Sequence, residues 1–429
     1  MHFSTPRFRA MLLLIFLMAL GIRVGITHMT VGLDSPPDAG ANPDQLDYEL
    51  FAHHLAQGKG FTTSTGEPTA RRTPGASMML LPPYLIFGRS YAAGRIWFCI
   101  LSALTCIVVA YGSRQYFSRG VALLAAFAVA IYPGHFYYAM HFLSETPFAL
   151  FVALAIAFTL AAMRQKRMSL DVAAGIAWGL AVLMRPNIVL AAPIALFMIL
   201  FARGVRLPTA RRWAVQAVMM ALVISPWLVR NAVVMGTPSL TSIGGLGLFC
   251  THNDRTFNDP DFYGGWVRAS ETQRILDIQL TGSEFEQDAQ AKQIAMSYIA
   301  ENADKIPGVV AEKLGRLLTP VADTSNVPVK IAFAVSWLIA APLVLYGMWV
   351  AWRKHRAAAC VLLIPILTTF ATAVIYYGLI RFRDSIAPVF LVLAAIGVHD
   401  LMMKMYNKDS KPNQKPQATS QPHQYKRAA

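Results

Sequence analysis

Long apolar stretches, separated by short polar segments, recur along the whole chain. A helix that crosses a bilayer needs about 20 predominantly apolar residues. We predict a membrane helix in each stretch that fits or approaches this length, namely 8–29, 90–111, 121–136, 147–163, 170–184, 188–201, 213–229, 331–352, 357–377 and 385–403. The pattern therefore predicts an all-α polytopic membrane protein with a bundle of about ten transmembrane helices.

The basic residues indicate which way these helices run. They gather in the short connections 114–119, 164–167, 203–212 and 353–356 and after residue 403. With the N-terminus inside, all these segments fall on one side, as the positive-inside rule requires. The longer connections 31–88, 131–146 and 230–330 then face outward. We predict a membrane domain over 1–403 and, from its polar composition, a disordered cytoplasmic tail over 404–429.

Two outside loops contain further predicted helices. In the first loop, 31–88, apolar residues recur at helical spacing over 44–57, and Gly58 and Gly60 end the pattern. The apolar piece 78–87 is too short to span, so both helices are predicted to lie in the membrane interface. The last loop, 230–330, is helical in pattern and of a size that suits a small cap over a membrane site.

Composition supports the membrane assignment and removes several other classes. The chain is 55% hydrophobic and only 14% charged, whereas soluble domains carry about 25% charged residues. Its net charge of +15 follows the positive-inside pattern, so we do not expect a nucleic-acid partner. Three of the four cysteines lie in apolar stretches, which leaves no disulfide framework and no CxxC metal motif. The first apolar stretch lacks a small-residue cleavage site and is predicted to remain as an uncleaved helix.

The first outside loop carries candidate chemistry close to the membrane. Asp44 and Asp47 could accept a proton from an incoming hydroxyl, or they could serve the start of a helix as capping and dipole-favouring residues. Arg71 and Arg72 could bind a phosphate in the bidentate manner of guanidinium groups, or contact anionic lipid headgroups.

Other candidates lie in the later outward-facing connections. Glu145 stands at the mouth of an apolar helix, where an acid is expected to be paired, metal-bound or functional, although it could also favour the helix dipole. His141, just before it, is either a metal ligand or an ordinary interfacial side chain. Arg230, Arg381 and Arg383 face outward against the positive-inside bias, which suggests an anionic substrate.

The order of these residues resembles that of the GT-C superfamily of polytopic glycosyltransferases, in particular bacterial relatives of protein mannosyltransferases and of the aminoarabinose transferase of lipid A. The first-loop pattern is carried by Asp44, Tyr48, Ala52, Leu55, Gly58, Gly60 and Phe61, followed by Arg72, Pro74 and Gly75. Later landmarks are Ser144-Glu145, Arg185-Pro186, Pro226-Trp227 with Arg230-Asn231, and Arg381-Phe382-Arg383. The resemblance extends over nearly the whole membrane portion.

The resemblance implies an inverting hexosyl- or pentosyltransferase that moves a sugar from a polyprenyl-phosphate donor to a lipid, glycan or protein acceptor. It implies a multi-pass protein of the bacterial inner membrane, with the active site facing the periplasm. Asp44 matches the catalytic aspartate, with Asp47 in reserve. Glu145 matches a metal-holding acid, which together with Asp44 and His141 would bind a divalent ion, Mg²⁺ or Mn²⁺. The residues expected to contact substrate are Tyr48, Arg71, Arg72, Arg230, Arg381 and Arg383.

One departure from the family pattern concerns the metal. Many relatives carry Asp-Glu where this chain carries Asp44-Gln45, so one charge is missing from the expected metal geometry.

Two other functions remain open from the sequence. A transporter or flippase of lipid-linked sugars would place ionisable groups at mid-bilayer and show repeated halves, whereas here the acids cluster at one face and no internal repeat is evident. A non-catalytic assembly subunit is the third hypothesis, which the density of Asp and Arg in the first loop disfavours.

Overall fold

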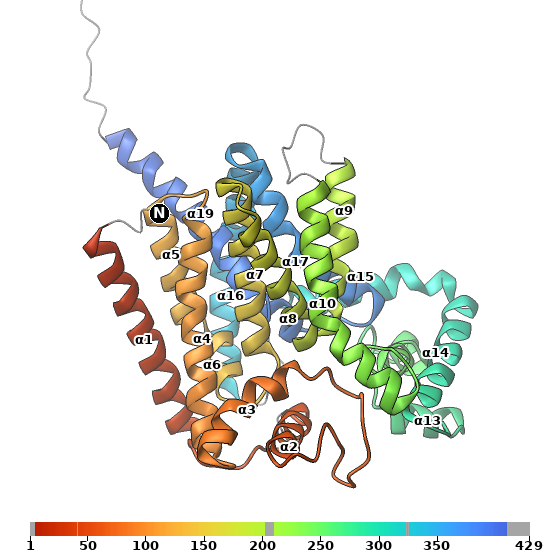
Figure 1. Cartoon of the computed structure of the whole chain (residues 1–429). Helices are drawn as coiled ribbons and strands as arrows, with labels where there is room; N and C mark the ends of the chain where they lie inside the picture. The colour runs from red at the N-terminus through yellow and green to blue at the C-terminus, as the bar shows by residue number, and fades with distance from the viewer. Residues whose placement is uncertain (1–4, 41, 202–209, 323, 325, 410–429) are drawn as a thin grey trace, which may run out of the picture.

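The computed structural model describes residues 5–409 except 41, 202–209, 323 and 325 (Figure 1). Within these residues all the named elements are helices, and the one extended pairing is a single bridge between Thr62 and Pro68. The all-α architecture predicted from the apolar pattern is therefore confirmed. The residues of the predicted tail beyond 409 lie outside the described part, as does most of the basic connection 203–212.

Seven of the described helices are long and apolar enough to cross a membrane, which makes the chain a multi-pass membrane protein. They are α1 (Pro6–Thr30), α4 (Tyr91–Ser113), α7 (Glu145–Gln165), α10 (Ala210–Met235), α16 (Val327–Lys354), α17 (Arg356–Ile375) and α19 (Ala387–Asp409). An eighth span results if α5 (Arg119–Ile131) and α6 (Pro133–Ala139), which meet at 51°, count as one.

The predicted count of about ten is not confirmed, because two predicted spans are short helices. α8 (Met168–Met184) ends at Arg185, whose backbone is extended, and Pro186 opens the 3₁₀ turn η1 (Pro186–Leu190) before α9 (Ala191–Phe201). A proline disfavours the helical conformation of the residue before it, which favours the end of the helix at Arg185. The break between α8 and η1 places the charged side chain of Arg185 at the end of the apolar helix α8.

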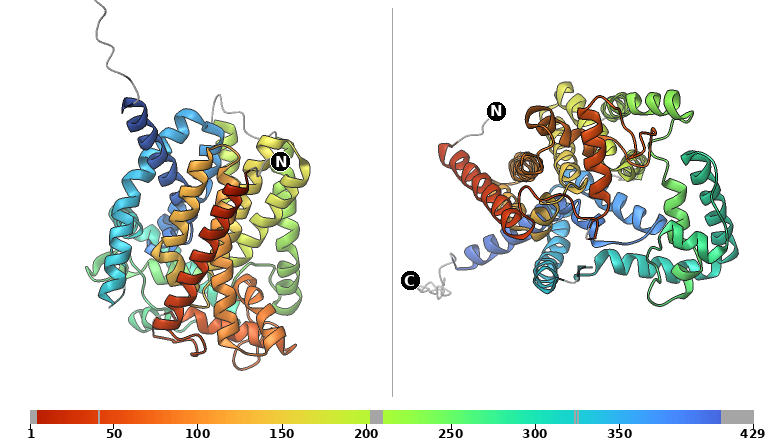
Figure 2. Two further views of the ribbon diagram at one scale, coloured as in Figure 1. Left: turned by 90° about the vertical axis from the view of Figure 1, so that its left-hand side faces the viewer. Right: turned by 90° about the horizontal axis from the view of Figure 1, so that it is seen from below.

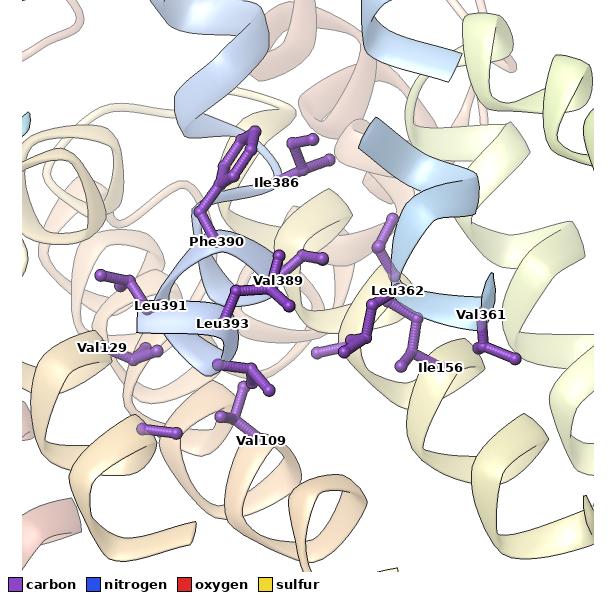
Figure 3. Packing of buried hydrophobic residues seen from close by; sticks show 14 of the residues in the cluster. Val109, Val129, Ile156, Val361, Leu362, Ile386, Val389, Phe390, Leu391 and Leu393 are labelled. Atoms are coloured by element: carbon purple, nitrogen blue, oxygen red, sulfur yellow. The ribbon is translucent and has the colours of Figure 1, made fainter. Parts of the chain in front are cut away.

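The core of the bundle is formed by small and branched apolar residues from α4, α5, α7, α17 and α19. Figure 3 shows this packing around Val109, Ile156, Leu362 and Leu393, all of them buried. Gly347 of α16 lies against Gly397 of α19, and a side chain at either position would collide with the facing backbone. Such small residues let membrane helices approach closely, which gains van der Waals contact where the hydrophobic effect between helices is absent.

A buried arginine stabilises the bend between α5 and α6. Pro133 has no N–H, so the carbonyl of Val129 loses its helical partner. Arg23 of α1 donates to that carbonyl at 3.1 Å, to the carbonyl of Ala130 at 3.0 Å and to the Ser102 hydroxyl at 2.7 Å. Buried backbone groups in a membrane need internal partners, and this cation supplies them.

Two short helices cover one end of the bundle. α2 (Asp44–Ala56) and α3 (Gly75–Phe87) lie at the end opposite the N-terminus and the last turns of α19 (Figures 1 and 2). α2 agrees closely with the helix predicted over 44–57. Gly58 and Gly60 follow it with φ of 72° and 76°, a backbone conformation that favours glycine, and so end the helix as expected.

Residues 236–318 form a helical cap beside the same end, green to teal in Figure 1. Its elements are α11 (Gly244–Thr251), α12 (Asp254–Asn258), α13 (Ala269–Leu276), α14 (Glu284–Glu301), η2 (Ala303–Lys305) and α15 (Ile306–Leu318). The short helix α18 (Ile380–Asp384) returns to this end between α17 and α19. The small helical cap predicted over 230–330 is thus present.

Candidate active site

α2 is fixed in place by a buried acid on its inner face. Glu49 accepts two hydrogen bonds from Arg89, at 2.8 and 2.7 Å, and one from the hydroxyl of Tyr84 on α3 at 2.9 Å. A two-pronged guanidinium–carboxylate contact is strong and fixes orientation. Because α2 cannot roll against α3, its first residue, Asp44, holds a defined position.

Asp44 lies between two arginines that are far apart in the sequence. Arg72 donates to its Oδ1 at 2.6 Å and Arg381 donates to its Oδ2 at 2.8 Å. Arg72 also contacts Asp47, one turn along α2, at 3.1 Å. The residue before Asp44, Pro43, begins the helix without a side-chain cap, and both oxygens of Asp44 face arginines.

The arginines decide the ionisation of Asp44. Burial alone would raise the pKa of its carboxyl, but the nearby charges of Arg72 and Arg381 outweigh burial and lower the pKa to about 2. Burial likewise opposes the charge on Arg72, and the Asp44 carboxylate overcomes it and raises the pKa of the guanidinium. Asp44 is therefore ionised at any physiological pH.

Glu145 is a further acid at this end and is almost fully buried, with 1% of its side chain exposed. Arg185 donates to it at 2.6 Å, and Arg381 donates to both of its oxygens. A carboxylate at this depth is costly unless it is paired, and here two guanidinium groups compensate it. Arg381 thus bridges Glu145 and Asp44 and joins two loops into one cluster.

Arg185 belongs to this cluster although it was not among the predicted site residues. The α8–η1 break turns it toward Glu145, and its guanidinium lies 5.2 Å from the ring centre of Phe382. The sequence signal for it is an arginine-proline pair inside an apolar stretch, Arg185-Pro186. The cluster balances three carboxylates against three guanidinium groups, namely Asp44, Asp47 and Glu145 against Arg72, Arg185 and Arg381.

Tyr48 completes the inner side of the cluster. It is buried on α2, one turn after Asp44, and its ring centre lies 5.8 Å from the guanidinium carbon of Arg72. Burial raises the pKa of its phenol, so Tyr48 stays protonated and can donate a hydrogen bond.

Three of the predicted substrate arginines lie elsewhere. Arg230 donates to the backbone carbonyls of Thr69 and Phe61, both at 2.9 Å, and so supports the loop that carries Arg72. Arg383 is buried, with Asp384 at 3.0 Å as its partner. Arg71 is exposed and precedes Arg72 at the edge of the cluster.

The residues expected to hold a metal do not fit one. His141 packs against the ring of Tyr137, with centroids 5.2 Å apart, and burial lowers the pKa of its imidazole to about 4. Asp44 and Glu145 each face two arginines, whose guanidinium groups take the positions that a cation would need. Across the described residues no group of three or more His, Cys, Asp or Glu is arranged to hold a metal ion. The expected set of Asp44, Glu145 and His141 is therefore not supported as a metal site.

Comparison with known proteins places this arrangement in a broader context. The sequence model of a family described as dolichyl-phosphate-mannose-protein mannosyltransferase matches residues 71–229, which include Arg72, Glu145 and Arg185. No curated protein sequence matches the chain. Among solved structures, the oligosaccharyltransferase AglB of Archaeoglobus fulgidus, in complex with an inhibitory peptide and a dolichol-phosphate, superimposes with a TM-score of 0.57 at 15% identity. The chain has the GT-C membrane fold.

That alignment covers 95% of this chain and 52% of AglB, so the chain spans about half the length of this GT-C relative. A second structure of the A. fulgidus oligosaccharyltransferase, tethered to an acceptor peptide, gives a TM-score of 0.57 at 18% identity and covers 95% of this chain and 51% of that one. ArnT from Cupriavidus metallidurans, bound to undecaprenyl phosphate, aligns over 95% of this chain and 80% of its own at 15% identity, with a TM-score of 0.43. The two oligosaccharyltransferase superpositions confirm the resemblance to GT-C proteins at the level of the fold.

Proposed function

We propose that this protein is an inverting glycosyltransferase that moves a sugar from a polyprenyl-phosphate donor to a lipid, glycan or protein acceptor. We place the reaction at the periplasmic face of a bacterial inner membrane. The observation that carries the proposal is the cluster in which Arg72 and Arg381 meet Asp44 at the capped end of the bundle. It combines a proton acceptor with phosphate-binding groups at one end of the helix bundle, where we expect a lipid-linked phosphate to lie.

The chemistry is a single displacement. The acceptor hydroxyl oxygen bonds to the anomeric carbon as the bond from that carbon to the phosphate oxygen breaks, which inverts the configuration. Asp44 takes the hydroxyl proton. The leaving polyprenyl phosphate gains negative charge, which Arg72 and Arg381 stabilise through charge-assisted hydrogen bonds.

The role of Asp44 as base and the role of the arginines as phosphate-binding groups are linked, because the arginines can exchange Asp44 for the phosphate. With both arginines on its carboxylate, Asp44 has a pKa of about 2 and is a weak base. When a donor phosphate draws a guanidinium group toward itself, Asp44 loses part of that stabilisation and its basicity rises. Glu145 and Arg185, which contact Asp44 only through Arg381, keep that arginine in reach of both partners.

Two comparisons support the donor class. The matching family model is described by a dolichyl-phosphate-linked mannose donor, and the structure of AglB is a complex with a dolichol-phosphate. The periplasmic assignment rests on charge, because basic connections such as Arg353–Arg356 lie at the opposite end of the bundle from α2.

The test is direct consumption of donor by purified protein in lipid nanodiscs. We expect wild-type protein to release polyprenyl phosphate from at least one member of a panel of polyprenyl-phosphate sugars, and Asp44→Asn to abolish release while folding normally. Mass spectrometry of envelope lipids and glycans from a deletion strain should then show one missing sugar. If purified protein moves such a lipid across the bilayer without consuming it, the protein is a flippase and the proposal is wrong.

A further inference from the structure

The cap meets the first outside loop at the start of α14. One carboxylate oxygen of Glu284 accepts a hydrogen bond from the Thr69 hydroxyl at 2.7 Å. The other accepts from the backbone N–H of Ala70 at 3.0 Å and from the hydroxyl of Ser242 at 2.7 Å. Thr69, Ala70 and Ser242 are all buried. One cap residue thus accepts two hydrogen bonds from the segment just before Arg72 and one from Ser242 within the cap.

These contacts hold the backbone from which Arg72 extends. Thr69 and Ala70 come just before Arg71 and Arg72 in the chain. The Ser242 N–H donates to the carbonyl of Ala70 at 2.9 Å, and the Thr241 hydroxyl donates to the carbonyl of Arg71 at 3.1 Å. The segment that delivers Arg72 to Asp44 is therefore fixed from the cap side.

An apolar contact reinforces the same junction. Phe285, next to Glu284, packs against a buried cluster that includes Phe51 of α2, Phe61 and Trp227. The first turn of α14 therefore packs against an apolar cluster to which both the helix that carries Asp44 and the loop that carries Arg72 contribute.

Glu284 is not needed to build its own helix. The start of α14 is capped by Ser283 and Glu286, since the Ser283 side chain accepts from the Glu286 N–H and the Glu286 carboxylate accepts from the Ser283 N–H at 2.7 Å. Such a reciprocal cap satisfies the free backbone donors of a helix start. The hydrogen bonds of the Glu284 carboxylate all leave the helix. They therefore stabilise the segments at Thr69-Ala70 and at Ser242 and not the helix start.

We infer that Glu284 is a positioning residue for the donor-phosphate site, acting through Thr69 and Ala70 to hold Arg72 where it can pass from Asp44 to the phosphate. This inference rests on the proposed transferase function. A preorganised cation stabilises developing charge without first having to be ordered, and a fixed loop lowers the entropic cost of binding the donor. The cap thereby becomes part of donor recognition.

The experiment compares Glu284→Ala with Glu301→Ala, an exposed acid at the other end of the same helix. Donor titrations should show KM raised about tenfold in Glu284→Ala with kcat unchanged, because the donor must reorder the loop as it binds. Glu301→Ala should match wild type. Glu284→Gln, which keeps one acceptor oxygen, should fall between them. A lower kcat at unchanged KM would indicate only a smaller folded fraction and would overturn the inference.

A second measurement does not depend on activity. The Ala70 N–H donates to Glu284, so hydrogen–deuterium exchange in a peptide covering 69–72 should be faster in Glu284→Ala than in wild type or Glu301→Ala. Equal exchange would show that Glu284 does not hold the loop. Faster exchange with an unchanged KM would show that the loop does not serve the donor. If wild-type protein consumes no polyprenyl-phosphate sugar, the proposed function fails, while the exchange result still decides whether Glu284 orders this loop.

Discussion

Arg381 joins Asp44 and Glu145, so its replacement should separate stability from catalysis. Arg381→Met keeps an unbranched side chain of similar width, though shorter, and removes the charge. Glu145 then retains Arg185 at 2.6 Å but loses its second cation, while only 1% of its side chain is exposed. Asp44 keeps Arg72, and a quarter of its side chain reaches solvent, so most of the cost falls on Glu145.

The size of that cost follows from burial. Removing one partner from a buried ion pair costs about 3–5 kcal/mol, and the remaining bond to Arg185 argues for the lower end. Arg381→Met leaves three carboxylates against two guanidinium groups in the cluster, and Glu145→Gln in the same protein restores the balance. We therefore expect the double variant to be more stable than the sum of the single changes predicts, with a coupling energy of about 2 kcal/mol.

The assay is a double-mutant cycle by denaturant unfolding in a single detergent, alongside donor turnover. Stability should recover in the double variant, whereas activity should stay at least about 100-fold below wild type, because the leaving phosphate still lacks one of its two cations, Arg381. Additive stabilities would mean that Arg381 and Glu145 do not form the buried pair. Restored activity in the double variant would mean that Arg381 serves only to neutralise Glu145.

Four further outcomes are expected. Asp44→Asn should lower kcat by about 100-fold or more, whereas Asp47→Asn should change activity less than about fivefold, because it removes only one partly exposed ion pair. Equal losses in the two variants would mean that Asp44 and Asp47 do not differ in role. Arg72→Gln should raise the pKa of Asp44 from about 2, because burial is then opposed by one guanidinium group fewer, so the acid limb of residual kcat/KM should move to higher pH. An unmoved limb would exclude Asp44 as the base. Donor turnover should survive dialysis against a chelator, because guanidinium groups surround both Asp44 and Glu145. Turnover that is lost on dialysis and restored by Mg²⁺ or Mn²⁺ would contradict this. Arg23→Met should lower unfolding stability by about 3 kcal/mol, as it leaves buried carbonyls without partners, and unchanged unfolding would refute the role of Arg23 at the α5–α6 bend.

The helices could be predicted because their signals are local. An apolar stretch in lipid requires a helix whatever surrounds it, and Gly58 and Gly60 ended α2 where expected. The α5–α6 bend within the predicted stretch 121–136 was missed, although Tyr132-Pro133 marks it. Composition there stays apolar through the bend, so hydropathy alone gives no sign of it.

The site could be predicted only in part because membership depends on contacts between distant segments. Arg381 and Arg383 are two residues apart on one short helix, and residues at that spacing do not face the same side. One reaches Asp44 and the other stays buried with Asp384. Charge and hydropathy are the same for both, so only the orientation of α18, set by the fold, separates them.

The sequence spacing within the arginine cluster has a consequence for biogenesis. Asp44 finds Arg72 only 28 residues further along the chain, and Glu145 finds Arg185 after 40, whereas Arg381 follows these acids by 337 and 236 residues. During insertion from the ribosome, each acid can therefore acquire a nearby cation soon after it enters the bilayer. The bridging arginine arrives last, once α17 has been made. The growing chain therefore does not carry an unpaired acid in lipid, and the complete cluster of acids and arginines forms only when synthesis is almost complete.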